Sequence, residues 1–149
     1  IKDNDVKSAI NYCEKVNSPI SRVFAKGVND YKFDTVSVRQ ALDNNAGLEI
    51  AALEKGLPIL STIAAIAPML GFLGTVTGMV QAFWQMSNAG NNIDVSLLSS
   101  GIYEAMVTTV GGLIVGIIAL FAYNYLVMLV DRIQNFMEAD IISFIESNV

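Results

Sequence analysis

The sequence predicts an all-α membrane protein, with two long transmembrane helices and cytoplasmic helical extensions. Hydrophobic residues make up 53% of the 149 positions and charged residues only 15%, a balance too apolar for an ordinary water-soluble domain. No charged residue occurs between Lys55 and Asp94, and Glu104 is the only one between Asp94 and Asp131. Each interval exceeds the ~20 residues that cross a bilayer. Because lipid offers no partner to a backbone amide, each apolar run is expected to be a helix.

The composition excludes several classes of function. Histidine is absent, which rules out imidazole metal sites and His-based catalytic machinery. The single cysteine, Cys13, can form neither an internal disulfide nor a zinc cluster, and we interpret it as a small packing residue. The net charge of −5 gives no basic surface for nucleic acid. We therefore expect no metal, no cofactor, no nucleic-acid partner and no enzymatic activity.

Residues 1–56 are predicted to form a cytoplasmic helical region. They hold eight of the nine lysines and arginines, interleaved with acidic residues in a way that suits solvated helices. Ser18-Pro19 indicates a helix start, since proline is favoured in the first turn. A second helical pattern begins near Thr35 and leads to the first span. Because the chain opens at Ile1 rather than Met, we expect that something upstream is missing.

The two predicted spans cover residues 57–86 and 97–130, and a short polar turn at 87–96 joins them. Residues 131–149 continue with apolar positions at helical spacing, which predicts an amphipathic tail helix. All lysines and arginines lie outside the turn. Since cytoplasmic flanks collect basic residues, both termini are predicted to be cytoplasmic and the turn periplasmic.

Small residues recur in both spans and are interpreted as helix-packing positions, because they let helix backbones approach closely in lipid. They are Gly71, Gly74 and Gly78 in the first span and Gly112 and Gly116 in the second.

Polar side chains inside the spans are the candidates for chemistry. Glu104 is an ionisable group within a span, so it should face protein or a watery cavity. It lies about two turns from the outer end, so an interfacial, structural role is the alternative. Thr75, Thr77, Thr108 and Thr109 supply hydroxyls at mid-membrane depth. Each of these could instead bond a carbonyl one turn back in its own helix.

Together these residues resemble a known family. The run from Leu57 to Met79, with LPILSTIA and APMLGFLGTVTGM, is similar to the second transmembrane helix of the ExbB/TolQ/MotA proton-channel superfamily. GIYEAMVTTVGGL at 101–113 and the later Ala122-Tyr123-Asn124 resemble the third helix. Ser18-Pro19-Ile20 and LEKGL at 53–57 resemble the cytoplasmic segment of ExbB, the nearest member.

The resemblance covers nearly the whole chain, with three departures. Family members often have Trp at the position of Thr77 and Pro at that of Ile118, and both differences concern helix shape. ExbB also has a further transmembrane helix ahead of its cytoplasmic segment. We expect this chain to be a fragment, and a natural two-span member is the alternative.

The resemblance implies a homo-pentameric bundle around a central pore in the lipid of the bacterial inner membrane. The pore would enclose an ExbD-type single-span partner whose Asp carries protons, and a TonB-type protein would pass the work to outer-membrane transporters. It implies that Thr75 and Thr109 are pore hydroxyls facing that Asp, with Thr108 beside them. It implies that Glu104 is a membrane-embedded carboxylate near the subunit contact. A Tol-type subunit, a motility stator and a passive scaffold are the alternatives.

Overall fold

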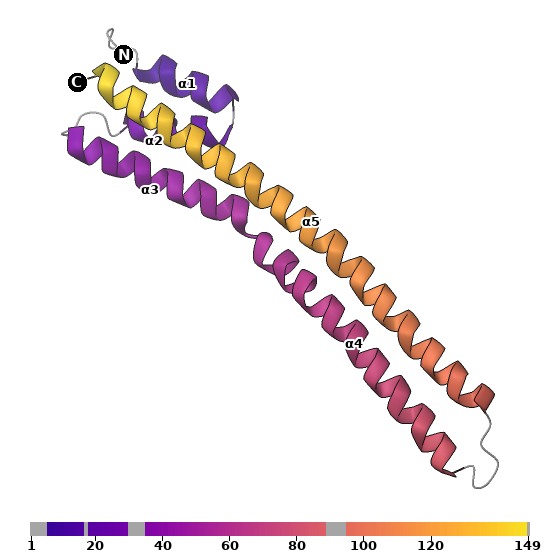
Figure 1. Cartoon of the computed structure of the whole chain (residues 1–149). Helices are drawn as coiled ribbons and strands as arrows, with labels where there is room; N and C mark the ends of the chain where they lie inside the picture. The colour runs from indigo at the N-terminus through magenta and orange to yellow at the C-terminus, as the bar shows by residue number, and fades with distance from the viewer. Residues whose placement is uncertain (1–5, 17, 30–34, 89–94, 149) are drawn as a thin grey trace. The chain divides into compact units, whose positions relative to one another are not determined.

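A computed structural model describes residues 6–16, 18–29, 35–88 and 95–148, and all regular structure in these ranges is helical (Figure 1). The helices are α1 (Val6–Val16), α2 (Pro19–Asn29), α3 (Thr35–Glu54), α4 (Leu57–Asn88) and α5 (Val95–Asn148). The all-α class predicted from the sequence is thus confirmed for the described residues. The chain forms two compact units, residues 1–55 with 127–149 and residues 56–126, and α5 contributes to both.

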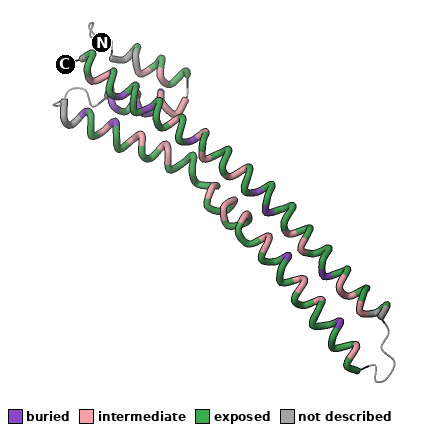
Figure 2. The backbone as a smooth tube through the Cα atoms, viewed as in Figure 1, coloured by how far each residue is buried: buried purple, intermediate pink, exposed green. Residues whose placement is uncertain are grey.

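The first unit has a small hydrophobic core. Buried residues of this unit lie on α2, α3 and the last part of α5, where the tube is purple (Figure 2). The core side chains are Val23, Val38, Leu42, Met137 and Ile141. Gly27 on α2 lies against Leu42, and a β-carbon at this glycine would overlap that side chain. The apolar spacing along the C-terminal part of α5 is therefore used inside the chain, as the face of α5 that packs on α2 and α3.

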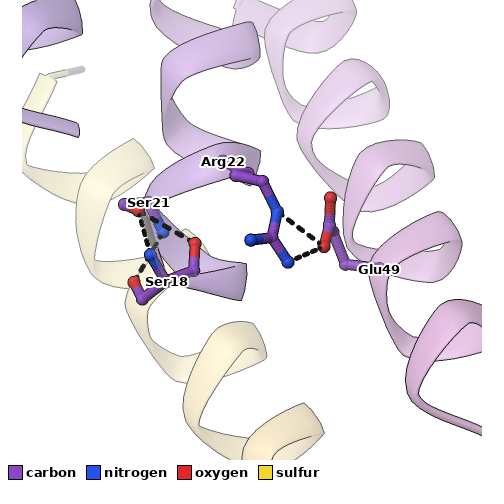
Figure 3. A network of polar contacts seen from close by, with 4 residues as sticks. All are labelled: Ser18, Ser21, Arg22 and Glu49. Carbon is purple, nitrogen blue, oxygen red and sulfur yellow. Dashed lines mark hydrogen bonds and ion pairs between the residues drawn. The ribbon is translucent and has the colours of Figure 1, made fainter. Parts of the chain in front are cut away.

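The start of α2 is fixed by two serines (Figure 3). The Ser21 backbone N–H donates to the Ser18 hydroxyl at 3.2 Å, and the Ser18 N–H donates to the Ser21 hydroxyl at 2.8 Å. This reciprocal pair satisfies two amides that the first turn of a helix leaves without partners. Pro19 follows the cap, where its missing N–H costs nothing.

An ion pair joins α2 to α3 (Figure 3). Arg22 donates to the Oε2 atom of Glu49 from Nη2 at 2.6 Å and from Nε at 3.0 Å. The hydrogen bond from the guanidinium holds the pKa of Glu49 below its usual value. The pair therefore stabilises the α2–α3 contact while Glu49 is ionised.

In the second unit, α4 and the first part of α5 form an antiparallel helical hairpin (Figure 1). Its surface is strongly apolar, with Phe72, Ile117 and Phe121 exposed by 65% or more. Two helical stretches are long and apolar enough to cross a membrane. They are Val38–Asn88, which includes most of α3 and all of α4, and Leu98–Ser147 in α5. Only 6% and 17% of their most apolar parts are buried in the chain. Apolar helices exposed in this way suit contact with lipid rather than a soluble core.

The predicted boundaries can be placed on these helices. The first predicted span, 57–86, lies within α4, which continues to Asn88. The second predicted span, 97–130, and the predicted tail, 131–149, lie along α5, which is continuous through residue 131 and ends at Asn148. Of the turn predicted at 87–96, residues 89–94 lie outside the described part of the chain.

Candidate functional site

The closest approach of α4 and α5 is lined by glycines, here called the glycine seam. Its members are Gly71, Gly74 and Gly78 on α4 and Gly101, Gly112 and Gly116 on α5. A β-carbon at Gly78 would lie 2.8 Å from the Ala105 β-carbon, and one at Gly112 would lie 2.6 Å from the carbonyl oxygen of Ala67. Gly116 lies against the ring of Pro68, the proline inside α4. The glycines on α4 therefore contact α5, and those on α5 contact α4, within one chain.

The seam also fixes the register of the hairpin. Gly78 lies opposite Ala105, Gly74 opposite Thr108 and Gly71 opposite Gly112. Thr75, next to Gly74, is therefore level with Thr108 and Thr109. We call the level of Thr75, Thr108 and Thr109 the threonine layer. Glu104 lies four to five residues closer to the 89–94 connection, about 6–8 Å along the helix axis.

Most of the threonine hydroxyls bond their own helix. Thr75 donates to the carbonyl oxygen of Phe72 at 2.6 Å, and Thr77 donates to that of Leu73 at 2.9 Å. Thr108 donates to the carbonyl oxygen of Ala105 at 2.7 Å. Local bonds of this kind are the alternative to a pore role for these hydroxyls.

Thr109 differs, because its hydroxyl crosses between the helices. It donates to the carbonyl oxygen of Gly71 on α4 at 3.0 Å. The Thr108 hydroxyl also lies 3.4 Å from this oxygen. The absence of a side chain at Gly71 is what lets the two helices come close enough for this bond.

The predicted polar residues fall on two flanks of the seam. On α4, Thr77 comes one residue before Gly78 and Thr75 one residue after Gly74, so they point to opposite sides. A groove on the flank of Thr77 is lined also by Glu104 and Thr108, whereas Thr75 and Thr109 do not line it. The structure therefore brings Thr75 and Thr109 to one level but separates both from the Glu104 groove.

Three further residues line this groove that were not among the candidates predicted from the sequence. Gln81 and Gln85 follow Thr77 at intervals of four, and Ser100 precedes Glu104 by four. That spacing puts each set on one helix face and could have been found from the sequence. They were missed because polar residues near the end of a span are also typical of the membrane interface.

No cluster of three His, Cys, Asp or Glu side chains that could hold a metal ion occurs among the described residues. Cys13, half-buried on α1, is a free thiol. The chemistry that this hairpin can offer is therefore that of hydroxyls, amides and one carboxyl group.

Comparison with known proteins places this arrangement in a family. Residues 15–139 match the MotA/TolQ/ExbB proton channel family. The chain is 37% identical over 103 residues to the putative biopolymer transport protein ExbB-like 1 of Synechocystis sp., covering 68% of this chain and 41% of the relative. It is 31% identical over 123 residues to the putative biopolymer transport protein ExbB homolog of Methanothermobacter thermautotrophicus, covering 83% and 43%.

A third relative carries a different name. The chain is 38% identical over 86 residues to the Tol-Pal system protein TolQ of Haemophilus influenzae, covering 58% of this chain and 37% of that protein. The chain thus spans about two fifths of the length of these curated relatives. The family match covers most of the sequence, including the whole hairpin and most of the cytoplasmic helices predicted before it. This chain is a membrane protein that belongs to the MotA/TolQ/ExbB proton channel family.

Proposed function

We propose that the chain is part of a subunit that uses the proton-motive force to energise TonB-dependent transport across the outer membrane. Five copies would surround an ExbD-type single-span partner in the bacterial inner membrane, with the 87–96 turn in the periplasm. The relatives named ExbB support this assignment. Each charge that crosses a membrane gains ~2.3 kcal/mol per 100 mV, so a few protons supply useful work.

The observation that carries the proposal is the threonine layer. Three hydroxyls lie at one depth in a pair of helices whose only charged side chain within the hairpin, over residues 57–88 and 95–126, is Glu104. A scaffold that only packs glycines against each other has no need of hydroxyls at this level. A subunit that handles a partner's carboxyl group does need them, because a carboxyl group in an apolar pore has few other hydrogen-bond partners.

The hydrogen bonds of Thr75 and Thr109 suggest how the layer would act. A hydroxyl has one proton to donate and two lone pairs that accept. Thr75 and Thr109 donate their protons to the carbonyl oxygens of Phe72 and Gly71, so they present lone pairs. Lone pairs accept a hydrogen bond from a protonated carboxylic acid.

An ionised carboxylate needs the opposite arrangement. To donate to it, each threonine hydroxyl must rotate away from its carbonyl partner. For Thr109, that rotation breaks the bond between α5 and α4 at Gly71. The hairpin as it stands therefore favours the neutral acid, and ionisation of the partner's Asp would be coupled to a change in the α4–α5 contact. This coupling offers a route from proton release to movement.

The test replaces the hydroxyl with a methyl group at nearly constant shape, in Thr75→Val. Removing a hydrogen-bond partner of a buried carboxyl group costs ~1–3 kcal/mol. At 1.4 kcal/mol per factor of ten, proton-driven uptake is expected to slow by roughly ten- to a hundredfold. Thr75→Val is the better test, because the Thr75 hydroxyl bonds only its own helix. Thr109→Val would also remove a hydrogen bond between α5 and α4.

Thr62→Val is the matched control. Thr62 is also on α4 and bonds its own helix, with its hydroxyl 2.7 Å from the carbonyl oxygen of Pro58, but it lies about three and a half turns from the threonine layer. Uptake should be measured for the full-length protein beside the yield of assembled complex. Parental uptake by a normally assembled Thr75→Val complex would remove the threonine layer from the mechanism and favour the scaffold.

A Tol-type role is the second candidate, since one relative is named TolQ. The two roles differ in the single-span protein that the subunit binds. Mass spectrometry of the small partner that co-purifies with the full-length protein distinguishes them.

A further inference from the structure

The groove on the Glu104 flank is a polar surface on a hairpin whose outer faces are strongly apolar. Its volume is about 400 Å³. Its polar lining consists of Thr77, Gln81, Gln85, Ser100, Glu104 and Thr108. The three residues from each helix are spaced four apart, so each set forms one stripe along its helix.

Four of the six polar side chains that line the groove lack partners among the described residues, while the Thr77 and Thr108 hydroxyls bond backbone carbonyls of their own helices. In the part of the chain that the structure describes, Gln81, Gln85, Ser100 and Glu104 form no side-chain hydrogen bond or ion pair. An amide or carboxyl group in hydrocarbon without a hydrogen-bond partner is costly. Lipid tails therefore cannot be what fills this groove.

Water fits the groove better than a helix does. At ~30 Å³ per molecule, 400 Å³ is room for about a dozen waters. A packed helix would have to bring matched donors for a carboxyl group, two amides and a serine hydroxyl. The hairpin itself offers no lysine or arginine within 56–93 or 95–126, so a second copy of it could not bring a cation to Glu104.

We infer that the groove is a water-filled vestibule, which brings water from the 89–94 end of the hairpin past Glu104 to the level of the threonine layer. From Gln85 to Thr77 it extends about 12 Å along α4, roughly two fifths of a ~30 Å hydrocarbon core. The inference that water fills the groove does not depend on the proposed function. The groove's use as the route by which protons reach the threonine layer rests on that function.

The vestibule also gives Glu104 a specific place. A carboxyl group in hydrocarbon has no hydrogen-bond partner, whereas one that lines the groove can bond to water. Thr108 ends the groove and is adjacent to Thr109 on the other flank. The water would thus stop one residue short of the flank that carries Thr75 and Thr109.

The test measures thiol reactivity at neighbouring positions of equal depth. Cys13 is the only cysteine of this sequence, so Cys13→Ser, with any cysteine elsewhere in the full-length protein also replaced by serine, gives a background without thiols. Gln81→Cys places a thiol in the groove, and Val80→Cys places one at the same depth on the apolar surface, where Val80 is 64% exposed. A charged methanethiosulfonate reagent reacts with the thiolate, which forms in water and not in lipid.

The full-length protein should be labelled in open membrane fragments, so that the reagent reaches both sides. We expect Gln81→Cys to react at least tenfold faster than Val80→Cys. On α5, Ser100→Cys should likewise react faster than Tyr103→Cys, whose position is 73% exposed. This second pair keeps the test decisive if a substitution at Gln81 prevents insertion.

Two results would overturn the vestibule. Slow labelling at both members of each pair would mean that a helix or lipid fills the groove. Fast labelling at both would mean that water reaches all faces of this end of the hairpin, so that the groove is no more hydrated than the surface beside it. Because labelling needs no proton flow, this outcome is independent of the Thr75→Val uptake test.

Discussion

Two adjacent glycines on α5, Gly111 and Gly112, provide a test of the glycine seam, because only Gly112 lies against α4. A β-carbon at Gly112 would lie 2.6 Å from the carbonyl oxygen of Ala67 and 2.8 Å from the α-carbon of Gly71. At Gly111 a β-carbon would meet nothing within 4 Å. Gly112→Ala should therefore destabilise the α4–α5 hairpin, and Gly111→Ala should not.

The size of the effect follows from the atoms involved. The neighbours of Gly112 are backbone atoms of α4, which cannot move aside as a flexible side chain can. The two helices must separate, and such overpacking costs typically ~1–3 kcal/mol. Both substitutions gain the same helix propensity of up to ~1 kcal/mol. The difference between the variants therefore isolates the overpacking, and corresponds to roughly a 5- to 150-fold change in the unfolding equilibrium.

Energy transfer can follow the separation of the helices. Trp84 on α4 is the only tryptophan, and an acceptor on Tyr103→Cys in a Cys13→Ser background would report from α5. Titration with a denaturing detergent should lower the transfer at less detergent for Gly112→Ala than for Gly111→Ala. Identical midpoints for the two variants would refute the close contact at Gly112.

Three further predictions concern other parts of the chain. Cysteine at Asn91 should react with an impermeant reagent added outside spheroplasts; reaction only after lysis would reverse the proposed topology. Glu104→Gln should leave partial uptake if this side chain is structural and nearly none if proton flow needs its carboxyl group, with complex yield as the control. Glu49→Gln should lower the thermal stability of the full chain at pH 7. Arg22 lowers the pKa of Glu49 in the folded protein, so the ion pair stabilises the unsubstituted chain fully at pH values above ~4.3, the pKa of an unfolded glutamate. This stabilisation is lost as the pH falls through the lowered pKa of the folded state. Thermal melts followed by circular dichroism at several pH values should show the loss. Asp43→Asn is the control, since the Asp43 carboxylate is exposed and 3.8 Å from its arginine partner; an equal loss in both variants would contradict a special role for the Glu49 pair.

Much of the fold follows from the sequence because lipid imposes one strong rule. A stretch of some 38 residues without charge has to be helical, and the charge gap after Lys55 led directly to α4. The helix start at Pro19 could be expected from proline and serine, which act within a single turn. These signals are local, so no knowledge of tertiary contacts was needed.

The arrangement of the site could not be predicted in the same way. Glycines spaced by four predict a close contact but do not identify the partner helix, and here Gly78 meets Ala105 of the same chain. Which threonines are level depends on the hairpin register, set by many contacts along both helices. Helical spacing alone puts Thr75 and Thr77 on opposite sides of α4, but only the register shows that Thr77 shares its flank with Glu104.

The seam explains why the polar residues lie where they do. Close approach of two helix backbones leaves no room at the seam for a side chain larger than that of alanine or threonine, so Gln81 and Glu104 must lie beside it. The same closeness lets Thr109 reach the Gly71 carbonyl, a bond that a wider helix pair could not form. Polar groups therefore gather along both edges of the contact, while the outer faces stay apolar for lipid. The two edges differ in what can lie beside them. The edge with Glu104 holds a groove large enough for water. On the other edge, Thr75 and Thr109 donate their protons to carbonyl oxygens, so their hydroxyls offer lone pairs to a neighbour.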